Sequence, residues 1–369
     1  MTGKDFRFYD SRQKYLLFVT TTNEKNKIAE SIKPIISSLK PKQPALKIFD
    51  AGLGDGSLLM NVLRQCHQKF PNIPQLISGK EISMEDVRLT LEKLPDRFIE
   101  HQKMVFVISN LHYSEAASLT SSNIKKQKKI NWMTVKLKGN SSLEFNSQLR
   151  DIEKKVAKNW QVERHPKSGN PTYKEPSVLI IYREDQDFVL KNIIPTIKNP
   201  ENTFDLILAS QPYRSRIAVE KKVNYVIKPM IKALSSKGQL LVVHASGHDP
   251  ANTIIKKLWP RDNPFPSLSK EIINYLKKNL NKNLLKDINI LPTKKIKYSL
   301  RALPNEISNG ISTSIIFSAW NAATYVNQIN DIDILNAEKE KDYEKIVSKI
   351  IKKNKGLWFS NELLRIVKK

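Results

Sequence analysis

Apolar side chains follow two different periods along the chain, and the two alternate. Residues 45–49 form a short apolar run that predicts a strand, and residues 57–70 place apolar side chains at helical spacing. The same order recurs over residues 74–94, and residues 103–113 are dense in Val, Ile and Phe, as a buried strand would be. Strands that alternate with helices predict a mostly parallel sheet with helices on both faces.

The alternation is interrupted once and then resumes. Residues 114–200 are polar and basic, with one β-rich piece at 177–184, and we interpret them as an insertion or small subdomain. A strand that ends in a polar turn over 204–214, a helix over 218–234 and a strand over 238–247 restore the pattern.

Both ends of the chain are expected to extend a central domain that covers residues 45–325 and is interrupted at about 114–200. Residues 1–44 have apolar positions at helical spacing before two prolines break the pattern. Residues 326–369 alternate in charge, which is typical of a solvated helical extension. Residues 295–304 and 312–326 are expected to form the closing strands of the sheet.

The sequence DAGLGDG, Asp50 to Gly56, stands directly between the first predicted strand and the helix that follows it. Glycines at 52, 54 and 56 allow a tight turn and a close approach of the backbone to a ligand, because no Cβ is in the way. The start of the helix presents free amides to an electronegative group. A nucleotide-type cofactor is therefore favoured, although the spacing differs from the GxGxxG of dinucleotide-binding folds.

This arrangement resembles motif I of the class I S-adenosylmethionine-dependent methyltransferases, in which an acidic residue, any residue and then Gly-x-Gly-x-Gly follow one another. The resemblance implies a Rossmann-like α/β fold with a mostly parallel seven-stranded sheet, and S-adenosyl-L-methionine as cofactor. It implies that Asp50, Gly52, Gly54 and Gly56 face the methionine part of the cofactor. It also implies that Glu81, at the end of the second predicted strand, accepts hydrogen bonds from both ribose hydroxyls, a task that suits a carboxylate.

Two further assignments follow from the same resemblance. Asn110, which ends the third predicted strand, is expected to hydrogen-bond the adenine. Ser210, Gln211 and Tyr213 stand in Ser-Gln-Pro-Tyr, similar to the Asn/Asp/Ser-Pro-Pro-Tyr/Phe/Trp motif of amino-methyltransferases except at Gln211. These three residues are expected to hold the methyl acceptor, with Tyr213 stacking on a flat group. A looser likeness in layout to histamine N-methyltransferase favours a small amine.

The charge of the chain points to a polyanion without requiring one. The 369 residues include 62 Lys and Arg against 36 Asp and Glu, a formal net charge of +26, and residues 121–170 hold 12 basic against 4 acidic residues. Such an excess favours contact with nucleic acid, RNA or DNA. Arg is scarce relative to Lys, however, so a compositional bias with no nucleic-acid partner accounts for the charge equally well.

Several other classes are excluded by composition. The single cysteine, Cys66, permits no intrachain disulfide and no cysteine-based zinc cluster, and the histidines and acids lack the HExxH spacing, so we expect no metal. The chain has no window of 18 uncharged apolar residues and no secretory signal at its start. We therefore expect a cytoplasmic protein that does not enter a membrane.

The sequence thus predicts an S-adenosylmethionine-dependent methyltransferase that acts on an N or O acceptor, with nucleic acid as one candidate carrier of that acceptor. A small amine or a protein side chain is the alternative acceptor, and aminopropyl transfer is an alternative reaction on the same fold. A non-catalytic RNA-binding protein with a methyltransferase-like fold is the contrasting class, because a fold does not prove an activity. The oligomeric state is left open.

Overall fold

A sheet of ten strands runs through the part of the chain that the computed structural model describes, residues 12–166, 170–198, 203–301, 313–340 and 342–369. Five parallel strands form its centre in the order β3-β2-β1-β8-β9. Their bounds, in that order, are Met104–Ser109, Gln75–Lys80, Leu46–Asp50, Phe204–Ser210 and Leu234–Ala245. The predicted Rossmann-like, mostly parallel α/β fold is confirmed, with ten strands in place of seven.

The order of the strands reverses at β1, because β1 pairs with β2 on one side and with β8 on the other. Doubly wound sheets bind their ligands outside the carboxyl ends of the strands at such a point. We call this side of the sheet, where β1, β2, β3 and β8 end, the carboxyl edge.

The last strand corrects the prediction of a helical extension over residues 326–369. Residues Trp358–Lys368 form β12, which pairs antiparallel with β9 on one side and with β11, Lys294–Ser299, and β10, Ile288–Ile290, on the other. The helix before it ends because Lys355 and Gly356 both have positive φ, 52° and 130°. The alternating charges predict the helical first part of this segment correctly. In its last part, burial of Leu364 and Ile366 favours a strand of the sheet.

The segment 114–200, which we call the inserted segment, lengthens the main sheet on the side of β3. Strand β7, Ser177–Arg183, pairs antiparallel with β3, and β4, Asn131–Leu137, forms the outer strand beside it. The remaining elements of this segment are α6 Tyr113–Ala116, α7 Ile124–Lys129, α8 Ser142–Asn159, the hairpin of β5 Val162–Arg164 with β6 Pro171–Tyr173, a 3₁₀ turn Glu184–Gln186 and α9 Asp187–Leu190.

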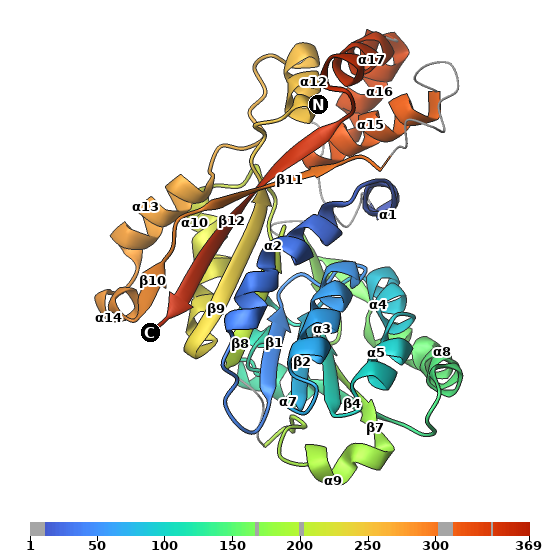
Figure 1. The fold of residues 1–369 in the computed structure, drawn as a ribbon, viewed down its shortest axis with the longest axis vertical. Helices are drawn as coiled ribbons and strands as arrows, with labels where there is room; N and C mark the ends of the chain where they lie inside the picture. Colours follow the sequence, from blue (N-terminus) through green and yellow to red (C-terminus); the bar gives the residue numbers. More distant parts are fainter. Residues whose placement is uncertain (1–11, 167–169, 199–202, 302–312, 341) are drawn as a thin grey trace.

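Helices cover both faces of the sheet and build a separate apolar core on each. On one face Ile77 and Phe106 contribute to a core with α2, α3, α4, α5 and α8, and α2, α3 and α5 lie in front of the sheet in Figure 1. On the other face Phe49 and Ile207 share a core with α10, α11, α13 and the π-helical turn that connects α10 to α11. The bounds are α2 Glu24–Ser38, α3 Ser57–Lys69, α4 Met84–Leu91, α5 Leu94–Glu100, α10 Val219–Lys222, the π turn Val223–Ile227, α11 Lys228–Lys232, α13 Ser269–Asn279 and α14 Lys282–Lys286.

A third core lies beyond the carboxyl edge, among a group of helices (Figure 1). The sequence pattern predicts a strand for one of them. Residues Thr313–Val326, expected to form a closing strand, are helix α15; Ala319, Ala322 and Ala323 are buried there and let other helices approach closely. Residue 312 and residues 302–304 of the predicted strands lie outside the described residues. The other helices of this core are α1 Arg12–Thr21, α12 Pro250–Leu258, α16 Asp331–Glu340 and α17 Asp342–Asn354.

Within the described residues, none of these helices combines the length and the apolar character that crossing a membrane requires.

Candidate functional site

The carboxyl edge gathers most of the residues that the sequence singles out. Asp50 and Ser210 end the neighbouring strands β1 and β8, while Glu81 and Asn110 directly follow β2 and β3. Because these four strands are adjacent in the sheet, positions spread over 160 residues of sequence meet at one place. Each sequence motif indicates the end of one strand only, and the order of the strands in the sheet brings these ends together.

The turn between β1 and α3, residues 50–56, is the glycine loop, and its geometry explains two of its three glycines. Gly54 and Gly56 have φ of +54° and +77°, which glycine adopts without the steric cost that a Cβ brings. A Cβ at Gly54 would also lie 2.4 Å from the Tyr15 hydroxyl, and one at Gly56 would lie 2.7 Å from Thr90 Oγ1. The loop is thus packed tightly against α1 at Gly54 and against α4 at Gly56.

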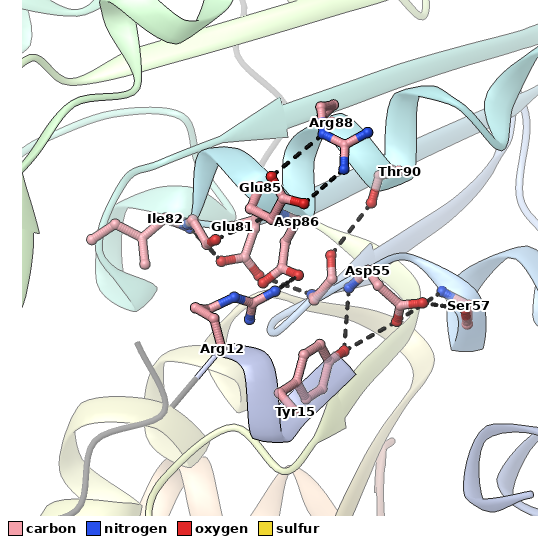
Figure 2. Close-up of polar contacts among 12 residues, drawn as sticks. Arg12, Tyr15, Asp55, Ser57, Glu81, Ile82, Glu85, Asp86, Arg88 and Thr90 are labelled. Atoms are coloured by element: carbon pink, nitrogen blue, oxygen red, sulfur yellow. Dashed lines mark hydrogen bonds and ion pairs between the residues drawn. The ribbon is translucent and has the colours of Figure 1, made fainter. Parts of the chain in front are cut away.

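Glu81 holds the glycine loop and the turn after β2 together (Figure 2). One carboxylate oxygen accepts a hydrogen bond from the Gly54 amide at 2.8 Å, and the other accepts from the amides of Ile82 and Ser83, each at 2.8 Å. These bonds use three of the roughly four acceptor positions of a carboxylate. The carboxylate is therefore fixed in direction and keeps an acceptor position for a ligand.

Helix α1 lies across the glycine loop, a contact that no local sequence signal indicates. The Tyr15 hydroxyl donates to Asp55 Oδ1 at 3.0 Å and accepts from the Asp55 amide at 3.2 Å. One turn earlier, the Arg12 guanidinium pairs with Asp86 at the start of α4, and Figure 2 shows both contacts beside Glu81. Burial, with the charge of Glu81 nearby, raises the pKa of Asp86 to about 8 against the opposing effect of Arg12.

Asp50 and Ser210 present buried polar groups at this edge. Asp50 is 1% exposed and accepts a hydrogen bond from the Gly52 amide at 3.1 Å. Burial raises its pKa to about 7, while the Gly52 amide and the Lys25 ammonium oppose that rise. The Ser210 hydroxyl is buried and has no hydrogen-bond partner within the described residues. A buried hydroxyl without a partner is the kind of group that water or a ligand satisfies.

The side chain of Asn110, predicted to contact adenine, is engaged with the inserted segment. Its carbonyl oxygen accepts from the Ser177 amide at 2.8 Å, and its amino group donates to the Glu175 carbonyl at 2.9 Å and to the Asn159 carbonyl at 3.4 Å. Asn110 thus fastens the start of β7 and the end of α8 to the end of β3. A contact with adenine stays a prediction.

The turn after β8 is held from both faces of the sheet. Gln211 has φ of +48°, and its side chain donates to the buried Glu24 at 3.3 Å and to Asn361 at 3.4 Å. Tyr213 is 6% exposed and belongs to the core on the opposite face. In this structure the ring of Tyr213 is surrounded by core residues. Its predicted stacking on an acceptor stays a prediction.

A buried chain of hydrogen bonds runs from Tyr213 toward β12. The Tyr213 hydroxyl donates to His244 Nδ1 at 3.2 Å, and His244 Nε2 lies 3.5 Å from the Glu362 carboxylate. Burial lowers the pKa of His244, so the neutral ring accepts at Nδ1 and donates from Nε2. Burial alone would raise the pKa of Glu362, but hydrogen bonds from His244 and Ser269 outweigh it and lower that pKa to about 2.

No cluster of three or more His, Cys, Asp or Glu side chains suited to a metal ion occurs within the described residues. The donor set of the carboxyl edge does fit an adenosyl cofactor. It offers two carboxyl groups, Asp50 and Glu81, a glycine loop that leads into a helix, and the unpaired hydroxyl of Ser210.

Comparison with known proteins shows a distant likeness in fold. No protein-family model matches the chain, and no curated protein matches it. Loganic acid methyltransferase with SAH is 10% identical with a TM-score of 0.40, and the match covers 94% of each chain. Geranyl diphosphate methyltransferase in complex with GPP and sinefungin is 9% identical with a TM-score of 0.35, covering 92% of this chain and 78% of the other. A SAM-dependent methyltransferase from Archaeoglobus fulgidus is 9% identical with a TM-score of 0.30, covering 94% of each chain.

Proposed function

We propose that this protein is a methyltransferase that uses S-adenosyl-L-methionine. The observation that carries the proposal is the 2.8 Å hydrogen bond from the Gly54 amide to the Glu81 carboxylate. It joins the glycine loop to the acid after β2, at the point where a doubly wound sheet binds its ligand. The glycine loop and the acid after β2, each recognisable separately in the sequence, therefore belong to one site whose polar groups suit the cofactor.

The residues of the carboxyl edge would divide the binding of the cofactor among them. When bound, the cofactor supplies a methyl group on a positively charged sulfur. Glu81 would accept a hydrogen bond from a ribose hydroxyl at its remaining acceptor position, and Asp50 would hold the methionine part. Transfer by in-line displacement needs a well-placed nucleophile more than a strong acid or base. Ser210, with its unpaired buried hydroxyl, would hydrogen-bond the acceptor.

For the acceptor we favour a group on a nucleic acid. Helix α7 carries four exposed lysines and no acidic residue. Lys126 Nζ lies 5.6 Å from the ring centroid of Tyr173, and that ring lies 4.9 Å from the ring of His112, just after β3. The basic helix thus stands close to the carboxyl edge, where a phosphate backbone held by lysines would bring its bases near Ser210.

Binding and transfer experiments with the full chain test this proposal. Glu81→Gln keeps the shape of the side chain and removes its charge, so we expect calorimetry to show about 10- to 100-fold weaker cofactor binding. Glu85→Gln, an exposed neighbour on α4, is the matched control and should bind as the unchanged chain does. If the unchanged chain binds no cofactor at millimolar concentration, the proposal is wrong and a non-catalytic binding protein is favoured.

Transfer of labelled methyl groups to separated RNA, DNA, protein and small-molecule fractions tests the acceptor. Label in a nucleic-acid fraction is the expected result. Label only in the small-molecule or protein fraction would keep the methyltransferase and contradict the nucleic-acid acceptor.

A further inference from the structure

The inserted segment touches the cofactor-binding acid itself through one hydrogen bond. The indole Nε1 of Trp160 donates to the backbone carbonyl of Glu81 at 2.9 Å. Trp160 follows the last residue of α8, is 2% exposed, and belongs to the core between α8 and the sheet. The donor is therefore held rigidly by packing, and its direction is set by the inserted segment.

Both backbone polar groups of Glu81 are fixed by neighbours. The Glu81 amide donates to the Ser109 carbonyl of β3 at 2.9 Å, while its carbonyl receives the Trp160 indole. Fixing both groups fixes the peptide planes on either side of the Cα atom, and these planes set where the carboxylate points. A displacement of the carbonyl would change the bonds from the Gly54, Ile82 and Ser83 amides as well.

A second connection lies one residue away along α8. The Asn159 carbonyl accepts from the Ser177 hydroxyl at 3.1 Å and from the Asn110 amino group at 3.4 Å. The end of α8 is thereby attached to the ends of both β2 and β3. Neither contact needs a charged side chain of the inserted segment, so its basic surface is free for a different task.

We infer that Trp160 is a positioning residue for Glu81, and that the inserted segment is a structural part of the cofactor site. This inference rests on the proposed function, because it assigns Glu81 to the cofactor. It adds that a segment outside the five central parallel strands is required for tight cofactor binding.

The test is Trp160→Phe, which keeps an aromatic ring in the core and removes the N–H donor. We expect the dissociation constant for S-adenosylmethionine, measured by calorimetry, to rise about 5- to 30-fold, because a buried carbonyl loses its donor beside the carboxylate. In a transfer assay the KM for the cofactor should rise while kcat at saturating cofactor changes little. Trp132→Phe, on β4 of the same segment, is the matched control and should leave cofactor binding unchanged.

Fluorine NMR of the unsubstituted chain labelled with 5-fluorotryptophan gives a second readout, which decides the matter if Trp160→Phe does not fold. The chain has five tryptophans, and replacing the other four in turn assigns the Trp160 resonance. Cofactor should shift the Trp160 resonance and leave that of Trp132 in place. Cofactor binding by Trp160→Phe equal to that of Trp132→Phe, or binding with no shift at Trp160, would overturn the inference. Failure of the unchanged chain to bind would instead contradict the proposed function.

Discussion

Lys222 is a charged residue in an apolar core, and its surroundings explain how it is tolerated. It is 1% exposed, its Nζ donates to the Ser267 carbonyl at 2.8 Å, and it lies 5.2 Å from the centroid of the Tyr213 ring. A cation over an aromatic face gains electrostatic attraction that offsets part of its lost hydration. Burial nevertheless dominates and lowers the pKa of Lys222 to about 8.

This lowered pKa predicts a pH-dependent contribution to stability. The pKa of lysine in the unfolded chain is about 10.5, so between pH 8 and 10.5 the unfolded chain binds more protons and stability rises with pH. The free energy of unfolding relative to Lys222→Met should rise by about 2 kcal/mol between about pH 8 and pH 10. Urea unfolding over this range measures it, with the exposed Lys221→Met as control. A difference that does not vary with pH would contradict the assignment.

At this scale the sequence predicts residues whose partners are close along the chain. Asp50, with the glycines that follow it, is recognisable because it acts within one turn, as its bond to the Gly52 amide shows. Tyr15, Arg12 and Trp160 are not recognisable, because they reach the site from segments 40, 74 and 79 residues away from their partners. Side chains of these types occur in many structural roles, and only the fold places them at the carboxyl edge.

Among the elements, α1 joins the glycine loop to the third core. On one side Tyr15 bonds to Asp55 of the glycine loop, and on the other Phe18 packs against Tyr325 of α15, with ring centroids 5.1 Å apart. The sequence pattern predicts a helix here but not its position. That position depends on α15, for which the sequence pattern favours a strand.

Removing the Tyr15 hydroxyl should loosen α1 from the glycine loop. Tyr15→Phe leaves the Asp55 amide without its acceptor, so we expect the free energy of unfolding to fall by about 1 to 2 kcal/mol. Hydrogen exchange of the amides at residues 54–57 should become faster, as measured by mass spectrometry or NMR. Tyr343→Phe on α17, where the hydroxyl contacts only the exposed Glu344 among the described residues, is the control. Unchanged exchange in Tyr15→Phe would show that α1 does not stabilise the loop.

For the whole molecule, the position of the charge matters more than its amount. Lys126 of α7 lies near Tyr173, whose ring contacts His112 just after β3, whereas the lysines of α13 and α14 lie on elements that cover one face of the sheet. Composition counts the lysines of both surfaces but does not show where they lie. The structure separates them into two basic surfaces, and their contributions to polyanion binding can be compared.

We expect the two surfaces to differ in their contribution to RNA binding. Replacing Lys125, Lys126, Lys128 and Lys129 by Gln should lower the slope of log affinity for single-stranded RNA against log salt by about 2 to 3, because each lost phosphate contact removes about 0.7. Replacing four of the five exposed lysines of α13 and α14 by Gln changes the net charge equally and should leave the slope nearly unchanged. The residues of this control are Lys277, Lys278, Lys282 and Lys286. Fluorescence anisotropy over a salt series measures both, and equal slopes for the two variants would indicate a non-specific effect of net charge.

The pairing of β12 with β9 has a consequence for how the chain folds. Asn361 of β12 pairs with Ala245 of β9, and the helices α12 to α17 lie between them in sequence. Pairing over such a separation requires a large loop to close before its contacts form, which slows folding. Until then β9, which contains the apolar residues Val242 and Val243, is an unpaired edge of the sheet, and such edges recruit other chains. Refolding should therefore lose more protein to aggregation as its concentration rises.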